Sequence, residues 1–66
     1  MLRPKNECIA SRAFASLILD YEWPENKSFG LPAQVSCRIL IEDLYQDTIT
    51  AGSRDEAIEM FNNWHK

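Results

Sequence analysis

The chain has 66 residues, the length of one small domain, and its hydrophobic fraction of 45% together with seven aromatic residues argues against disorder. Seven Lys and Arg residues stand against ten Asp and Glu residues, giving a formal net charge of −3. The basic residues are scattered along the sequence, which argues against the clustered positive charge of a sequence-independent nucleic-acid binder.

The first third of the chain fits two periodicities. With a helical period, one face collects Ala10, Ala13, Phe14, Leu17, Ile18 and Tyr21. With a period of two, the alternating set is Ala15, Leu17, Leu19, Tyr21 and Trp23. The helical period accounts for more positions in the first half and agrees with its alanines. We therefore predict a helix over about residues 6–19, followed by a short strand over about residues 20–23.

The middle of the chain shows the alternation of a half-buried strand. Apolar residues recur at every second position from residue 34 to 42, namely Val35, Cys37, Ile39 and Ile41. Residues 47–51 are rich in threonine and isoleucine and are predicted to form the antiparallel partner strand, with a connection near residues 43–46.

The last segment carries a helix start signal. Ser53 followed three residues later by Glu56 is a capping box, in which the serine side chain accepts the N–H of Glu56 and the glutamate reaches back to the Ser53 N–H. One helical stripe then follows, consisting of Ala57, Met60, Phe61 and Trp64. This predicts a helix over residues 54–64.

The elements together predict an α+β fold in a single domain spanning residues 1–66. It has an N-terminal helix, an antiparallel sheet of two to three strands, and a capped C-terminal helix packed on one face of that sheet. At this size only about 60% of the unfolded chain's surface is buried on folding, so the expected stability is small.

Two segments resemble the double-stranded-RNA-binding domain. They are Gly30-Leu31-Pro32-Ala33 leading into the strand at Val35, and Gly52-Ser53-Arg54-Asp55-Glu56-Ala57 opening the last helix. The resemblance implies a helix, three strands and a second helix. That family contacts phosphates with a lysine-rich start to its last helix, where this chain has Arg54, Asp55 and Glu56, and the loop histidine of the family is replaced by Ala33-Gln34. The resemblance therefore implies the fold without its RNA contacts, and no RNA-binding residue is carried over.

The residues for catalysis or for a metal site are missing from the sequence pattern. The only histidine is His65, next to the C-terminus, and Cys8 and Cys37 are far apart and outside any metal-binding spacing. The two glycines form no phosphate-binding loop. We expect no enzymatic activity, no metal and no cofactor, and two thiols that are reduced and buried.

Nothing in the sequence directs the chain to a membrane. The N-terminus lacks the apolar stretch of a signal peptide, and no apolar run approaches the about 18 residues that a span needs. We expect a cytoplasmic protein that makes no contact with a membrane.

A binding surface is predicted around the loop that precedes the first clear strand. Phe29 and Leu31 flank a glycine there, and they are expected either to be exposed or to fold back as a lid over the core. Tyr21 and Trp23 are candidates for an aromatic anchor or for the core. The residues predicted to bind a partner are an apolar centre with an acidic rim: Glu22, Glu25, Phe29, Leu31, Glu42 and Asp43.

The function predicted from these features is non-catalytic protein binding. An acidic surface would dock on a basic partner such as a nucleic-acid-processing protein, as small inhibitors and regulators made by phages and mobile elements do, in some cases by mimicking nucleic acid. Two alternatives stay open: a duplex-RNA-binding module with a patch at Arg3, Lys5 and Arg12, and a structural subunit of a larger assembly. Self-association of the chain is also left open.

Overall fold

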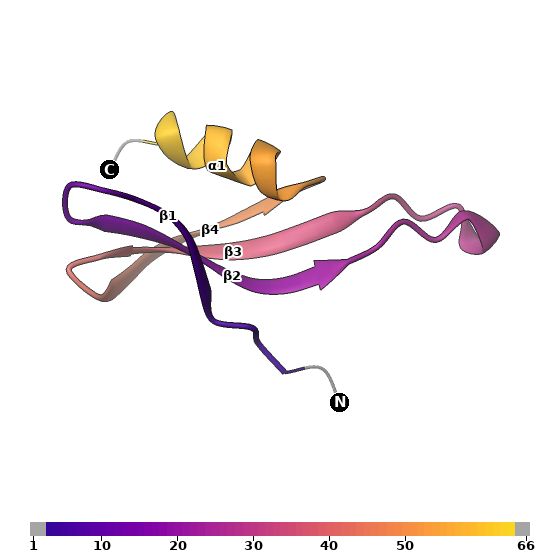
Figure 1. Ribbon diagram of the computed structural model, residues 1–66, viewed down its shortest axis with the longest axis horizontal. Coiled ribbons are helices and arrows are strands. Elements are labelled where there is room, and N and C mark those ends of the chain that lie inside the picture. The colour runs from indigo at the N-terminus through magenta and orange to yellow at the C-terminus, as the bar shows by residue number, and fades with distance from the viewer. Residues whose placement is uncertain (1–2, 65–66) are drawn as a thin grey trace.

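The computed structural model describes residues 3–64, which form a four-stranded antiparallel sheet with one helix on one of its faces (Figure 1). The strands follow one another in space as in the sequence, as a meander. Their bounds are β1 Glu7–Arg12, β2 Ala15–Trp23, β3 Gln34–Ile41 and β4 Leu44–Ala51. The helix α1, Arg54–Asn62, follows β4 directly. A short 3₁₀ helix, η1 Lys27–Phe29, lies between β2 and β3.

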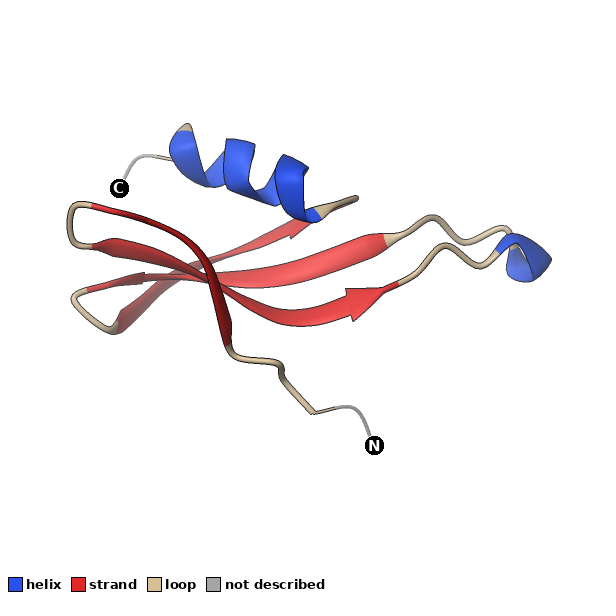
Figure 2. Ribbon diagram, in the orientation of Figure 1, coloured by secondary structure: helices blue, strands red, loops and turns tan. Residues whose placement is uncertain are grey.

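The predicted N-terminal helix over residues 6–19 is wrong, because this segment forms β1, a two-residue turn and most of β2 (Figure 2). Leu17 and Leu19 are both fully buried, which the period of two explains, since residues i and i+2 share a face of a strand but not of a helix. The turn between the strands places Ala13 at φ 47° and leaves Phe14 exposed. Pairing with β3 on one side and β1 on the other satisfies the backbone of β2, and this tertiary effect outweighs the helix propensity of the alanines.

The short strand predicted at residues 20–23 is therefore the end of the longer strand β2. The predicted strands at 34–42 and 47–51 are confirmed with small changes. Glu42 and Asp43 form a two-residue turn, with φ of 52° and 66°, so β4 begins three residues earlier than predicted. Positive φ at both turn residues is typical of hairpins whose strands keep the normal right-handed twist.

The C-terminal helix is confirmed, although it ends at Asn62 and the capping box is only half formed. The Ser53 hydroxyl accepts the Glu56 N–H at 3.2 Å, whereas the Glu56 carboxylate accepts the N–H of Gly52 and not that of Ser53. Within the predicted stripe, Ala57 and Phe61 are fully buried, but Met60 is 41% exposed.

The core lies between α1 and the sheet face that it covers. Its buried residues come from all of β2, β3, β4 and α1: Leu17, Leu19, Val35, Cys37, Ile39, Ile49, Ala51, Ala57 and Phe61. Both ends of the helix are also tied to β1. Arg54 lies 3.4 Å from Glu7, and Arg12 donates to the Asn62 carbonyl at 3.0 Å while its guanidinium lies over the Phe61 ring.

The opposite face of the sheet is left uncovered by α1, and an ion pair lies at its centre. Asp20 sits at an irregularity of β2, where the register shifts against β3, and its side chain accepts two hydrogen bonds from Arg38, at 2.7 and 2.9 Å. Within residues 3–64, Asp20 is the one charged residue that is buried. Further along the same strand, Tyr21 and Trp23 stack with their ring centroids 5.7 Å apart.

The two cysteines differ in their surroundings, which corrects the expectation that both are buried. Cys8 is exposed on β1, and Cys37 is buried on β3. Both are free thiols. Burial raises the pKa of the Cys37 thiol, so it is protonated and unreactive near neutral pH.

Candidate functional site

The most distinctive surface of the protein is a hairpin arm, residues 24–33, that projects beyond the sheet from the ends of β2 and β3 (Figure 1). The backbones of Asn26 and Leu31 exchange two hydrogen bonds, each of 2.9 Å, which close the arm into a loop. The Asn26 side chain accepts the N–H of Phe29 at 3.3 Å and caps η1. Gly30 follows at φ 66°, a left-handed conformation that glycine adopts without strain. The arm therefore has a defined backbone.

The arm holds large apolar side chains away from the core. Phe29 is 78% exposed and Leu31 57% exposed, so the alternative in which they fold back as a lid is wrong. No residue of the arm belongs to the buried core. These side chains do not contribute to the packing between the sheet and the helix, although the arm takes up ten residues of the chain.

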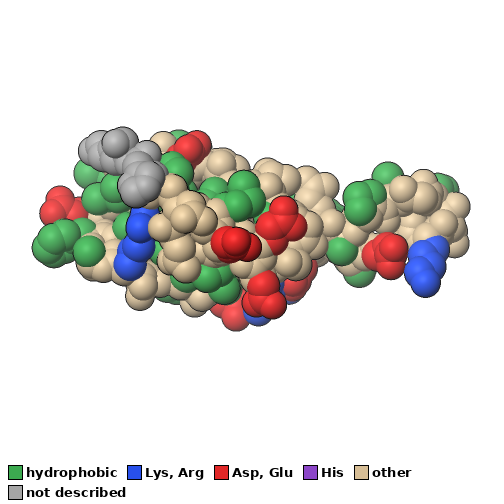
Figure 3. All heavy atoms as spheres, turned by 90° about the horizontal axis from the view of Figure 1, so that it is seen from above, with side chains coloured by type: hydrophobic (Ala, Val, Ile, Leu, Met, Phe, Trp, Pro, Cys, Tyr) green, Lys and Arg blue, Asp and Glu red, His purple; other side chains and the backbone are tan. Residues whose placement is uncertain are grey.

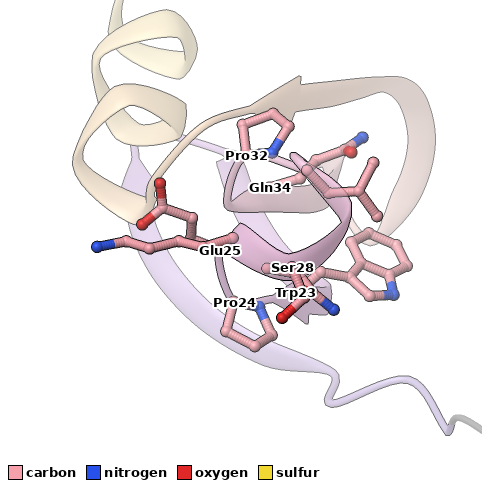
Figure 4. Close-up of a pocket in the computed structure, with 9 residues that line it drawn as sticks. Trp23, Pro24, Glu25, Ser28, Pro32 and Gln34 are labelled. Atoms are coloured by element: carbon pink, nitrogen blue, oxygen red, sulfur yellow. The ribbon is translucent and has the colours of Figure 1, made fainter.

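A hollow of about 560 Å³ lies along the arm, lined mostly by residues of the arm itself and closed at the base by Trp23 and Gln34 (Figure 4). Trp23, Pro24 and Pro32 give it an apolar wall, and Gln34 and Asn26 contribute polar groups. The Glu25 carboxylate and the Trp23 indole project to different sides of the arm in this view, so acid and aromatic are not neighbours. The hollow combines apolar surface with a few hydrogen-bonding groups, as sites for a partner's side chain do.

The six residues predicted to bind a partner are divided between two ends of the molecule. Glu25, Phe29 and Leu31 lie on the arm, and Glu22 lies at its base on β2. Glu42 and Asp43 form the β3–β4 turn, which is separated from the arm by the whole of β3, a distance of about 25 Å for eight residues. The structure therefore brings four of the six together and separates two.

Glu22 is engaged within the protein and does not form part of a free acidic rim. Its carboxylate accepts hydrogen bonds from Arg54 at 3.0 and 3.1 Å and lies 3.4 Å from the Lys5 ammonium. The hydrogen bonds from Arg54 hold the pKa of Glu22 below its usual value of 4.5, and Glu22 in turn raises the pKa of Arg54. This cluster ties β2, α1 and the N-terminal segment together behind the arm.

The Glu22 cluster predicts an acid-sensitive stability. A carboxyl whose pKa is lower in the folded state than in the unfolded state stabilises the fold above the unfolded pKa, and this stabilisation is lost as the pH falls through the folded pKa. We expect the urea concentration at half-unfolding to decrease as the pH is lowered from about 5 to about 3. Glu22→Gln should make this decrease with pH less steep. A variant with an unchanged slope would contradict the role of this carboxylate, and Glu25→Gln on the arm is the matched control.

The basic patch proposed for the nucleic-acid alternative is not formed. Lys5 lies against Glu22, before β1, whereas Arg12 lies at the other end of β1 and donates to the carbonyls of Asn62 and Trp64 at the helix C-terminus. These two cations are thus separated by the length of the strand and occupied by intramolecular contacts.

Chemically reactive groups do not gather elsewhere in the described part of the chain. Residues 3–64 contain no group of three or more His, Cys, Asp or Glu side chains placed to hold a metal ion. His65 lies outside the described residues. No helix within residues 3–64 has the length and apolarity required to cross a membrane.

No protein-family model, curated protein or solved structure matches this chain. The resemblance to the double-stranded-RNA-binding domain thus stays a prediction, and the N-terminal helix in its element order is replaced here by β1 and the first part of β2.

The arm was only partly predictable as a site. The sequence indicated the pair Phe29 and Leu31 around a glycine, and it offered Trp23 as an anchor or a core residue. It did not indicate Pro24, Pro32 and Gln34 as the walls of a hollow. The signal that could have revealed the arm is Asn26, whose side chain caps a turn ended by Gly30.

Proposed function

We propose that the protein is a non-catalytic binding module that uses its arm to dock on another protein. The observation that carries this proposal is the 78% exposure of Phe29 on an arm whose backbone is fixed by paired hydrogen bonds. A large apolar side chain gains free energy when a partner removes it from water. A loop that is already ordered loses little conformational entropy on binding, so more of that gain appears as affinity.

Trp23 supports the same surface. It is 38% exposed at the base of the arm, and its stacking on Tyr21 limits the motion of the indole. Rigid aromatic side chains beside a hollow are typical of the residues that dominate binding energy at interfaces. Trp23 and Leu31 both line the hollow, and Phe29 is exposed two residues before Leu31 on the same arm.

The free charge of the molecule favours a basic partner. Four of its cations are committed to intramolecular contacts: Lys5, Arg12, Arg38 and Arg54. By contrast, several exposed carboxylates have no ion pair within residues 3–64: Glu25, Glu42, Asp43, Asp55 and Glu59. Acidic side chains lie across the middle of the helix-covered face (Figure 3). Such a field accelerates encounter with a positively charged protein, such as one that processes nucleic acid, and makes binding sensitive to salt.

Site-specific cross-linking tests the arm as the contact surface. A photoreactive phenylalanine analogue is placed at position 29, and, as a matched control, at position 14, where Phe14 is 75% exposed at the turn between β1 and β2. In lysate of the cells in which the protein acts, we expect position 29 to cross-link one protein and position 14 not to do so. Equal labelling from both positions, or recovery of nucleic acid without protein, would contradict the proposal.

The affinity for the captured protein provides the quantitative prediction. We expect Phe29→Ala to weaken binding by at least about 30-fold, the lower end of an interface hot spot, and Phe14→Ala to leave it unchanged. Binding should also weaken as the salt concentration rises. Titration calorimetry at two salt concentrations measures both effects. An unchanged affinity after Phe29→Ala together with Leu31→Ala would exclude the arm.

A further inference from the structure

The second surface with a defined chemistry is the outer edge of β4. The sheet order makes β1 and β4 the two edge strands. β1 has six residues and an irregularity between Cys8 and Ala10. β4 has eight residues, and its irregularity lies near its start, at Gln46, which leaves a regular run of five residues over 47–51. An edge strand of this kind presents unpaired backbone groups to any strand that can lie beside it.

The register identifies which backbone groups of β4 point outward. The residues that flank a two-residue turn form a hydrogen-bonded pair, which here is Ile41 with Leu44. After the extra residue in β4, Asp47 is the next residue whose backbone N–H and C=O point toward β3. Ile49 and Ala51 then face β3, so Thr48 and Thr50 direct their N–H and C=O groups away from the sheet. The hydrogen bond from the Thr48 N–H to the Asp47 side chain, 2.8 Å, agrees with this direction.

The helix covers one face of β4, and the Trp64 indole N–H that follows it donates to Asp47 Oδ2 at 3.1 Å. This contact is made to a side chain of β4 and leaves the outward backbone groups of Thr48 and Thr50 at the edge. The first residue of α1, Arg54, contacts Glu7 of β1, and the carbonyl of the last residue, Asn62, accepts from Arg12 of β1. Both ends of α1 thus also contact β1, at the opposite edge of the sheet. The outward run of β4 also lacks the lysines and prolines by which exposed edges commonly prevent pairing.

We propose that the outer edge of β4 pairs with the same edge of a second copy of this chain, antiparallel and centred on Ile49. In this register Thr48 of one copy faces Thr50 of the other twice, and the outward groups exchange four backbone hydrogen bonds. The two Thr–Thr contacts lie on the open face of the sheet, and such pairs are favourable across strands. Asp47 faces Ala51 of the other copy, so the pairing opposes no like charges.

The sequence selects a second copy over an unrelated strand because the register is self-complementary. A two-fold interface requires each residue to match its symmetry partner, and the run Asp47–Ala51 does so without a charge clash or a gap in the hydrogen bonds. On pairing, the Thr48 N–H exchanges the Asp47 carboxylate for a backbone carbonyl. This exchange offsets part of the free energy of the new hydrogen bond, so the association is expected to be weak. This pairing is independent of the arm, and it would direct the two arms to opposite ends of an eight-stranded sheet.

Sedimentation equilibrium from about 1 μM to about 1 mM tests the pairing, because this range covers weak self-association. We expect the mass to rise from that of the 7.6 kDa monomer toward twice that value. The double variant Thr48→Lys with Thr50→Lys places like charges opposite each other twice across the interface. It should raise the protein concentration at which half of the chains are paired on the order of tenfold. Its control, Ser11→Lys on β1 with Ser16→Lys on β2, makes the same change in net charge on the side of the sheet away from β4.

A backbone variant separates the pairing from side-chain effects. Thr50→Pro removes one outward N–H and leaves the hydrogen bonds to β3 in place, as proline does on an edge strand. We expect it to abolish self-association while the circular dichroism spectrum of the monomer is retained. A protein that stays monomeric over the whole range overturns the proposal. So does association that survives both β4 variants, or that the Ser11 and Ser16 control weakens equally.

Discussion

Replacing Phe61 with alanine is expected to lower the free energy of unfolding by about 3–5 kcal/mol, the usual cost of removing a phenyl ring from a core. Phe61 is fully buried and is the largest of the fully buried side chains. It fills the space between α1 and the sheet, and the Arg12 guanidinium lies 5.1 Å from the centre of its ring. Because a domain of this size has a net stability of only about 3–5 kcal/mol, we expect Phe61→Ala to be largely unfolded at room temperature.

Urea unfolding followed by circular dichroism measures this effect, and the neighbouring residue supplies the control. Met60 belongs to the same predicted stripe but is 41% exposed. Met60→Ala should change the stability by no more than about 0.5 kcal/mol, as surface substitutions do. Similar losses for the two variants would mean that α1 packs with a different face toward the sheet. Phe61→Leu retains most of the buried volume, so it should fold, with a stability between those of Phe61→Ala and Met60→Ala.

The second half of the fold was predictable because its signals are local. Ser53 and Glu56 mark the start of α1 within four residues, and the alternation along residues 34–42 indicates β3 without reference to its neighbours. The turn at Glu42 and Asp43 was placed too late, since neither residue is a glycine and a glutamate gives no local signal for the positive φ that Glu42 adopts.

The first half was mispredicted because both periodicities share residues. Leu17 and Tyr21 fit either pattern, and the alanines favour the helix by their intrinsic propensity. What decides between them is the pairing of β2 with strands on both sides, a contact between segments up to about 25 residues apart, which a local pattern does not contain. Ala13 at positive φ is a further feature that its residue type does not indicate.

The exposed apolar residues of the loop could be recognised from the sequence, but their arrangement could not. Phe29 and Leu31 could be recognised as apolar residues in a loop, and only the fold decides that this loop extends past the sheet. The acidic rim failed for a similar reason. Glu22 belongs to an ion cluster with Arg54, a residue distant in sequence, and the turn of Glu42 and Asp43 lies at the far end of β3.

The ion pair on the open face leads to the second large effect. Asp20 is 8% exposed, and both of its carboxylate oxygens accept hydrogen bonds from Arg38. The same bonds raise the pKa of Arg38, so the guanidinium carries its charge at neutral pH. Arg38→Met keeps most of the apolar stem over the sheet and leaves the Asp20 carboxylate without its partner. A charged hydrogen-bonded group stranded in this way costs about 2 kcal/mol, and we expect a loss of stability of that size.

A double-mutant cycle separates the pair from the cost of stranding the acid. Asp20→Asn removes the charge and keeps the shape, so Asp20→Asn in the Arg38→Met background should recover part of the stability lost by Arg38→Met alone. Losses that simply add would mean that the two side chains stabilise the fold independently. Recovery would instead show that the arginine is required mainly because the aspartate is buried. The alternation along β2 that places Asp20 on this face, beside Ile18, would then be the feature that makes a basic residue necessary at position 38.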